Sequence, residues 1–131
     1  MDIFELFATD SKLETEGRWV NLGKAAKVLV ARAGNDKFNA RMKYLLKKNG
    51  VDLQDNSREN LDLVEKLFLD ATAEAVLLGW EGLTYQKEVL EYSKDNALKL
   101  LAVKDFRNKI VKLSEEMSGY LVADQEEQGN D

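Results

Sequence analysis

Carboxylates come closest to a reactive group in this sequence. Asp70 and Glu74 stand four residues apart, so on a helix they would share one side and could together hold a divalent cation. The alternative is a solvated helix flank beside Lys66. The sequence has no histidine and no cysteine, which excludes zinc sites, thiol chemistry and Ser-His triads. No glycine-rich phosphate loop accompanies the carboxylates. We therefore expect a protein that is not an enzyme and has neither metal nor cofactor.

Basic residues cluster in one segment of this acidic chain. Between Lys24 and Lys48, eight Lys and Arg residues stand against the single acid Asp36, although the net charge of the chain is −5. Clustered cations can contact phosphates, but Tyr44 is the one exposed aromatic expected among them. We therefore expect no nucleic-acid partner, and interpret the basic helix as a solvated face or as a surface docked on an acidic partner. Residues 49–91 carry ten acids against three bases, so the two segments either fold together or favour head-to-tail self-association.

Large aromatic residues gather around one predicted corner. Trp80, Tyr85 and Tyr92 stand close in sequence, and Trp19 could join them from a neighbouring hairpin. They form either a satellite core that seals the helix ends or a binding edge, because Trp and Tyr are enriched at interface hot spots. Arg32 is expected to pair with the acidic long helix or to contact a partner. The residues predicted to bind a partner are Trp19, Arg32, Tyr44, Trp80, Leu83, Tyr85 and Tyr92.

Two strands are predicted near the N-terminal end of the sequence. Residues 17–23 have a glycine at each end, and residues 27–32 are rich in β-branched side chains. The short loop from Gly23 to Ala26 should pair them antiparallel as a hairpin. A lone hairpin is marginal in water, so its apolar face must pack on helices.

Helical periodicity dominates the rest of the chain. Apolar residues recur at steps of three and four in four segments: 36–48 after Asn35, 57–78 closed by Gly79, 93–101 begun by Ser93, and one from Lys104 that fades around 119–122. Ser57 is the expected N-cap of the long helix. The predicted fold class is α+β, mainly α, with the N-terminal β-hairpin packed on a bundle of about four helices.

The two ends of the chain differ in character. Ile3, Phe4, Leu6 and Phe7 form an apolar cluster, which is either pinned to the core by its two Phe side chains or ordered only on a partner. Residues 1–122 are predicted to form a single domain, and the acidic residues 123–131 a disordered tail. The acidic start is unlike a secretory signal, and no apolar run approaches the roughly 18 residues of a membrane span.

Three blocks of sequence stand in a specific order and spacing. They are residues 7–10 leading to Glu16-Gly17-Arg18-Trp19-Val20-Asn21-Leu22-Gly23, then residues 30–38, and finally Gly79-Trp80-Glu81-Gly82-Leu83 followed by residues 92–101. Together they resemble the tail assembly chaperones of long-tailed bacteriophages and prophages. One departure is visible, because residues 86–91 stand where such proteins often carry a Gly-rich turn and a Pro.

The resemblance implies a non-enzymatic chaperone in the cytoplasm of the bacterial host. Such a protein would bind the phage tape-measure protein, help to recruit tail-tube subunits, and be absent from the mature virion. A longer, frameshifted product is frequent in that family. The alternatives are a virion structural protein such as a connector or tail-completion subunit, a nucleic-acid-binding regulator, and an enzyme built only on carboxylates and a metal.

Overall fold

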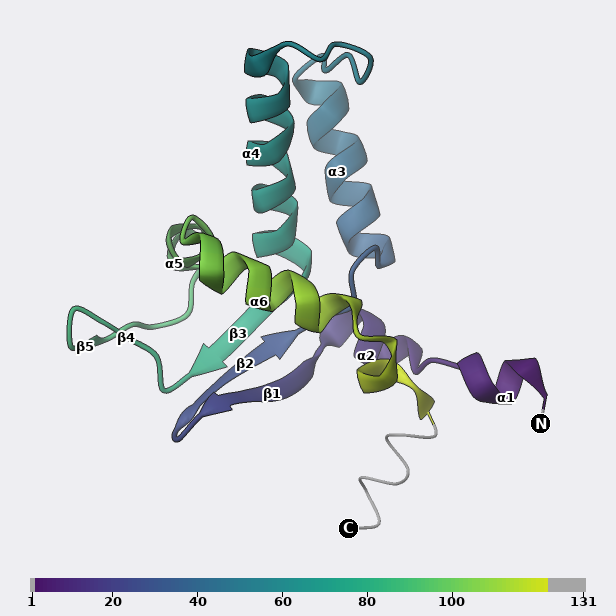
Figure 1. The fold of residues 1–131 in the computed structure, drawn as a ribbon, viewed down its shortest axis with the longest axis vertical. Helices are drawn as coiled ribbons and strands as arrows, with labels where there is room; N and C mark the ends of the chain where they lie inside the picture. The colour runs from purple at the N-terminus through teal and green to yellow at the C-terminus, as the bar shows by residue number, and fades with distance from the viewer. Residues whose placement is uncertain (1, 123–131) are drawn as a thin grey trace.

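A three-stranded antiparallel sheet organises the fold in the computed structural model, which describes residues 2–122 (Figure 1). Strands β1 (Arg18–Gly23) and β2 (Ala26–Val30) form the predicted hairpin, and β3 (Leu77–Glu81) pairs with the other edge of β2. Val28 stands opposite both Val20 and Trp80 in the register. Because side chains alternate along strands, these three residues share the face that packs on the helices.

The third strand replaces the predicted end of the long helix. Helix α4 (Arg58–Ala75) stops before residues 76–78, and Gly79 lies inside β3 instead of capping a helix. The buried Asn35 amide donates to the Ala75 carbonyl at 2.9 Å and so satisfies part of the helix end. Pairing with β2 satisfies the backbone of the apolar run that follows and buries Leu77 completely.

The three other helices that the sequence predicts begin close to their expected positions. Side chains of Asn35, Ser57 and Ser93 accept hydrogen bonds from first-turn amides, which confirms these three as N-caps. Beyond α4, the described residues contain α1 (Ile3–Phe7), α2 (Ser11–Glu16), α3 (Asp36–Lys48), α5 (Lys94–Leu101), α6 (Lys104–Glu115), a 3-10 turn at Met117–Tyr120, and a small hairpin of β4 (Thr84–Tyr85) and β5 (Glu88–Val89).

The hydrophobic core lies between one face of the sheet and helices α4, α5 and α6. It consists of residues from β2, α4, β3, α5 and α6, namely Val28, Val30, Ala73, Val76, Leu77, Trp80, Ala97, Leu101, Ile110 and Leu113. Helix α3 packs on α4 and forms with it an arm that projects from this core (Figure 1). The fold is therefore mixed α and β with helices predominating and an N-terminal hairpin, but the helices form an arm and a base, not one regular bundle.

The N-terminal helix does not pack on the core. Phe4 and Phe7 are 80% and 54% exposed, so the prediction that they pin this segment to the core is wrong. Figure 1 shows α1 extending away from the sheet. Its connection is nevertheless anchored, because the Val122 amide donates to the Ala8 carbonyl and Thr9 bridges Leu121. The predicted disordered tail, 123–131, lies outside the described residues.

Candidate functional site

The two carboxylates considered as a cation site are occupied by basic side chains. Asp70 accepts hydrogen bonds from Arg41 Nε at 3.0 Å and Lys94 Nζ at 3.1 Å, and Glu74 lies 2.8 Å from Lys94 Nζ. The sequence suggested either a cation site or a solvated flank beside Lys66, but the carboxylates pair with Arg41 and Lys94 instead. Within residues 2–122, no group of three potential metal-ligating side chains comes together. The cluster therefore ties α3, α4 and α5 to one another.

Charge pairing in this cluster shifts the pKa of each central group. Burial alone would raise the pKa of Asp70, but hydrogen bonds and charges from Arg41 and Lys94 outweigh it and hold the pKa below its ordinary value. The hydrogen bond to Asp70 raises the pKa of Arg41. Burial alone would lower the pKa of Lys94. The hydrogen bonds and charges of Glu74 and Asp70 outweigh that effect and raise the pKa. All three groups are thus more firmly charged than in a free peptide.

Two of the predicted partner-binding aromatics are engaged inside the fold. Trp80 and Tyr92 meet edge to face with ring centroids 4.9 Å apart. The Trp80 indole donates to the Leu90 carbonyl at 2.7 Å, and the Tyr92 hydroxyl donates to the Leu77 carbonyl at 2.8 Å. Burial raises the pKa of Tyr92. Trp80 is only 6% exposed and belongs to the hydrophobic core, against which Leu83 also packs, whereas Tyr92 remains 36% exposed.

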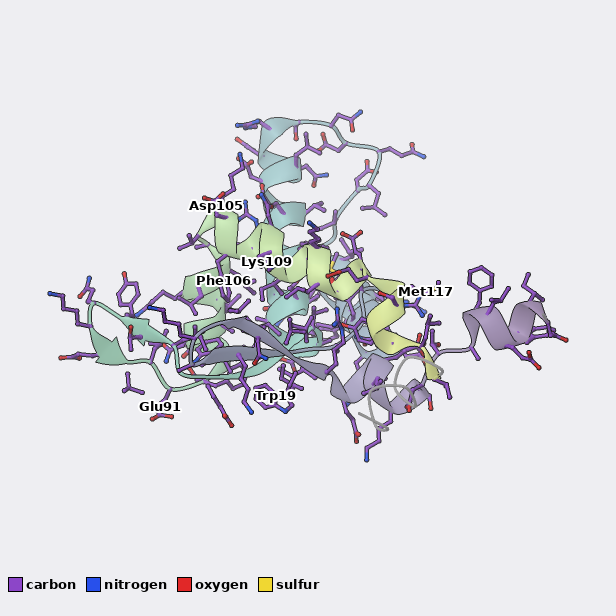
Figure 2. The ribbon with its side chains drawn as sticks, turned by 60° about the horizontal axis from the view of Figure 1, so that its bottom comes forward. Trp19, Glu91, Asp105, Phe106, Lys109 and Met117 are labelled. Carbon is purple, nitrogen blue, oxygen red and sulfur yellow. The ribbon has the colours of Figure 1, made fainter. Side chains whose placement is uncertain are left out.

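The other two aromatics of the predicted corner lie elsewhere. Trp19 stands opposite Leu29 on β2, and Leu29 stands opposite Gly79, so Trp19 lies on the sheet face away from the core. It is 47% exposed (Figure 2). Lys27 Nζ lies 4.6 Å from the centre of the Trp19 ring. Tyr85 is exposed on the β4–β5 hairpin beside Lys99. The expected meeting of Trp19 with the corner residues does not occur.

Arg32 forms a structural ion pair with a different helix from the one predicted. Its Nη1 lies 2.8 Å from Glu14 Oε1 on α2, and the Arg32 amide donates to the Glu14 carbonyl. The predicted salt bridge to the long helix is therefore wrong, because the carboxylate that pairs with Arg32 belongs to Glu14 of α2. This contact fastens α2 to the sheet.

Tyr44 reaches solvent on a flank of α3 that adjoins α4. It is 52% exposed, and its ring lies between Arg41 at 5.5 Å and Lys48 at 5.7 Å. An open hollow of about 500 Å³ beside it is lined by Lys37, Ala40, Arg41, Tyr44 and Glu74. Among the predicted partner-binding aromatics, Tyr44, Trp19 and Tyr85 are the most exposed, and Tyr92 is exposed to a smaller extent.

Helix α1 carries a group of exposed apolar residues that the predicted partner-binding set left out. Ile3, Phe4, Leu6 and Phe7 are 64%, 80%, 46% and 54% exposed. They are consecutive apart from Glu5, whereas the other exposed large apolar side chains stand singly. One signal in the sequence could have identified this surface. The apolar cluster is short, and a polar run separates it from the next apolar residues, as expected of a segment that does not join the core.

A family model described as "YdaY prophage protein" matches residues 33–130, well over half of the chain. The chain belongs to the YdaY prophage protein family. No curated protein and no solved structure matches it. In this YdaY protein the match covers α3 to α6 together with β3, and α1, α2, β1 and β2 precede it. Within the described residues, no helix is long and apolar enough to cross a membrane.

Proposed function

We propose that this YdaY family protein is a non-enzymatic tail assembly chaperone that covers apolar helical surface on a phage tape-measure protein. Membership in a prophage protein family supports the phage setting, and the order of the three sequence blocks supports the tail assembly role. The observation that carries the proposal is α1, which presents four neighbouring apolar side chains to solvent. A chaperone that lends its surface to another chain needs such a group.

The dimensions of α1 favour weak and reversible binding. A helix of five residues is far too short to persist in water without tertiary contacts, so a partner surface would stabilise it. Covering about 300 Å² of apolar area would contribute roughly 7 kcal/mol. Lost translational and rotational freedom costs about 4 kcal/mol or more. The small remainder is suited to a protein that must leave its client when the tail forms.

Co-expression with the tape-measure protein of the same prophage tests the proposal. We expect the wild-type chain to keep the tape-measure protein soluble and to co-purify with it, and Phe4→Ser with Phe7→Ser to abolish both effects. Leu53→Ser with Val103→Ser is the matched control, because these residues are 68% and 53% exposed elsewhere on the surface. Equal behaviour of the two double variants would refute the role of α1.

The composition of phage particles tests the second half of the proposal. A chaperone acts in the host cytoplasm, helps to recruit tail-tube subunits, and is absent from the mature virion. Mass spectrometry of purified particles should therefore detect the tape-measure and tail-tube proteins but not this chain. A stoichiometric signal from this chain would indicate a virion structural protein instead.

A further inference from the structure

The exposed flank of α3 that adjoins α4 carries positive charge around the Tyr44 ring. Arg41 is committed to Asp70, and Asp36 is the only acid on the helix. Among residues 2–122, no carboxylate lies within 4 Å of the four lysines of this helix, which are Lys37, Lys43, Lys47 and Lys48. This face therefore retains positive charge that the rest of the acidic fold does not neutralise at contact distance.

Two of these lysines, Lys37 and Lys48, lie on the same side of the helix as Tyr44. At 100° per residue, Lys37 lies about 20° and Lys48 about 40° from Tyr44 around the helix axis, one toward each end of the helix. Their Cα atoms are separated along the axis by roughly 16 Å, which is three helical turns. Ala40 lies beside them and leaves the hollow next to the Tyr44 ring open. We call Lys37, Ala40, Tyr44 and Lys48 the α3 stripe.

We propose that the α3 stripe binds an acidic helical segment of a protein partner. The matching segment carries carboxylates about eleven residues apart, which reach Lys37 and Lys48. Between them it carries apolar residues on the same side, which enter the hollow beside Tyr44. Tyr44 is held between two cations and loses little freedom on binding, as expected of an interface anchor.

The surroundings of the stripe favour a protein over a nucleic acid. Glu74 lines the hollow with a side chain 48% exposed, and Asp70 lies behind it, so a strand of phosphates would meet negative charge there. Phosphates follow one another far more closely than the two stripe lysines. Carboxylates on one side of a helix can be placed three turns apart and avoid Glu74.

A short helical peptide tests the proposal directly. The probe is a fluorescein-labelled 15-residue Ala/Gln-based peptide with Glu at its positions 2 and 13 and Leu at its positions 6 and 9, which places all four on one side. We expect the full chain to bind it with a Kd below about 1 mM, or about 4 kcal/mol, by fluorescence anisotropy at 50 mM NaCl. Binding should weaken at 500 mM NaCl because the Debye length falls to a few ångströms.

Matched variants separate a specific site from general attraction. Lys37→Gln with Lys48→Gln, and Tyr44→Ala separately, should each weaken binding at least fivefold. Lys104→Gln with Lys112→Gln removes the same charge from exposed positions on α6 and should change binding less than twofold. The probe with both Glu replaced by Gln should also lose binding. Thermal melting of each variant checks that these surface changes leave the fold intact.

Three results would overturn the proposal. They are no binding at 1 mM peptide, equal effects of the α3 and α6 variants, and tighter binding of a 15-nucleotide DNA strand that the α3 variants abolish. The last result would identify a nucleic-acid surface. The proposal does not rest on α1, so Phe4→Ser with Phe7→Ser should bind the peptide as the wild type does, whatever becomes of the chaperone role.

Discussion

Asp70→Asn removes the charge that ties three helices of this protein together. The carboxylate accepts from Arg41 of α3 and Lys94 of α5, and sits on α4 itself. Its side chain is 28% exposed, and those of its partners are 30% and 34% exposed. The asparagine has nearly the same shape and keeps one oxygen acceptor, so the substitution changes charge with little change in packing.

The expected loss is about 1.5 kcal/mol in the free energy of unfolding at neutral pH. A hydrogen bond to a charged group contributes roughly 1.5–3 kcal/mol, and an exposed ion pair up to about 1 kcal/mol. About a third of each partner side chain is exposed to solvent, which weakens each interaction toward the lower end of these ranges. Two contacts at somewhat under 1 kcal/mol each give the estimate, since the asparagine oxygen retains part of each bond.

The pH dependence has a definite sign. The pKa of Asp70 in the folded chain lies below its ordinary value of 3.8, so the unfolded chain takes up a proton first as pH falls. The stability from Asp70 is thus fully present above about pH 5, and is lost as pH falls through 3.8 and then through the folded-state pKa. The difference between wild type and Asp70→Asn should be constant from pH 5 to 8 and shrink below pH 4.

Urea denaturation followed by circular dichroism measures both effects. Asp62→Asn is the control, because it removes the same charge from α4 but loses only a contact to Arg58 at 3.7 Å, with side chains 64% and 89% exposed. We expect that control to change the free energy of unfolding by less than about 0.5 kcal/mol. Equal losses in the two variants, or a difference that persists unchanged at pH 3, would refute the reasoning.

Two further predictions concern local structure. Asn35→Ala should lower the free energy of unfolding, measured by urea denaturation, by about 3 kcal/mol, because the buried side-chain amide caps α3 and also donates to the Arg32 and Ala75 carbonyls. The control Asn39→Ala changes an exposed residue and should lower it by less than about 1 kcal/mol, so similar losses in the two variants would contradict the prediction. Gln86→Asn with Lys87→Gly should raise the free energy of unfolding by about 1 kcal/mol, because both residues have positive φ (53° and 69°) in the two-residue β4–β5 turn. A lower melting temperature in that variant would show that the turn is held by something other than its backbone preference.

Local signals in the sequence were sufficient for the helix starts. An N-cap depends on one side chain and on amides two or three residues later, and Asn35, Ser57 and Ser93 all act as predicted. The end of α4 was not predictable in this way. Residues 75–78 continue the apolar stripe of a helix, but they also suit a buried strand, and the choice depends on β2, which lies almost fifty residues earlier.

The surface residues show the same limit more sharply. Trp19 and Trp80 are the same residue type on the two strands that flank β2, yet Trp19 faces solvent and Trp80 is buried. The difference follows from the strand register. Trp19 stands opposite Leu29 and Trp80 opposite Val28, and these neighbours on β2 point to opposite faces of the sheet. A shift of one residue would exchange their faces. Residue type therefore identified aromatic candidates, but only the strand pairing decides which of them can meet a partner.

The family match and the fold divide the chain at different places. The match begins at residue 33, yet β3 inside it pairs with β2 outside it, and Val28 and Val30 of β2 are fully buried in the shared core. Without the hairpin, β3 would be an unpaired edge above an incomplete core. The hairpin is thus part of the folding unit. Figure 1 shows α1 extending away from the sheet and α3, which carries the α3 stripe, on the arm. Where α1 and the α3 stripe bind the same partner, the first contact raises the effective concentration for the second.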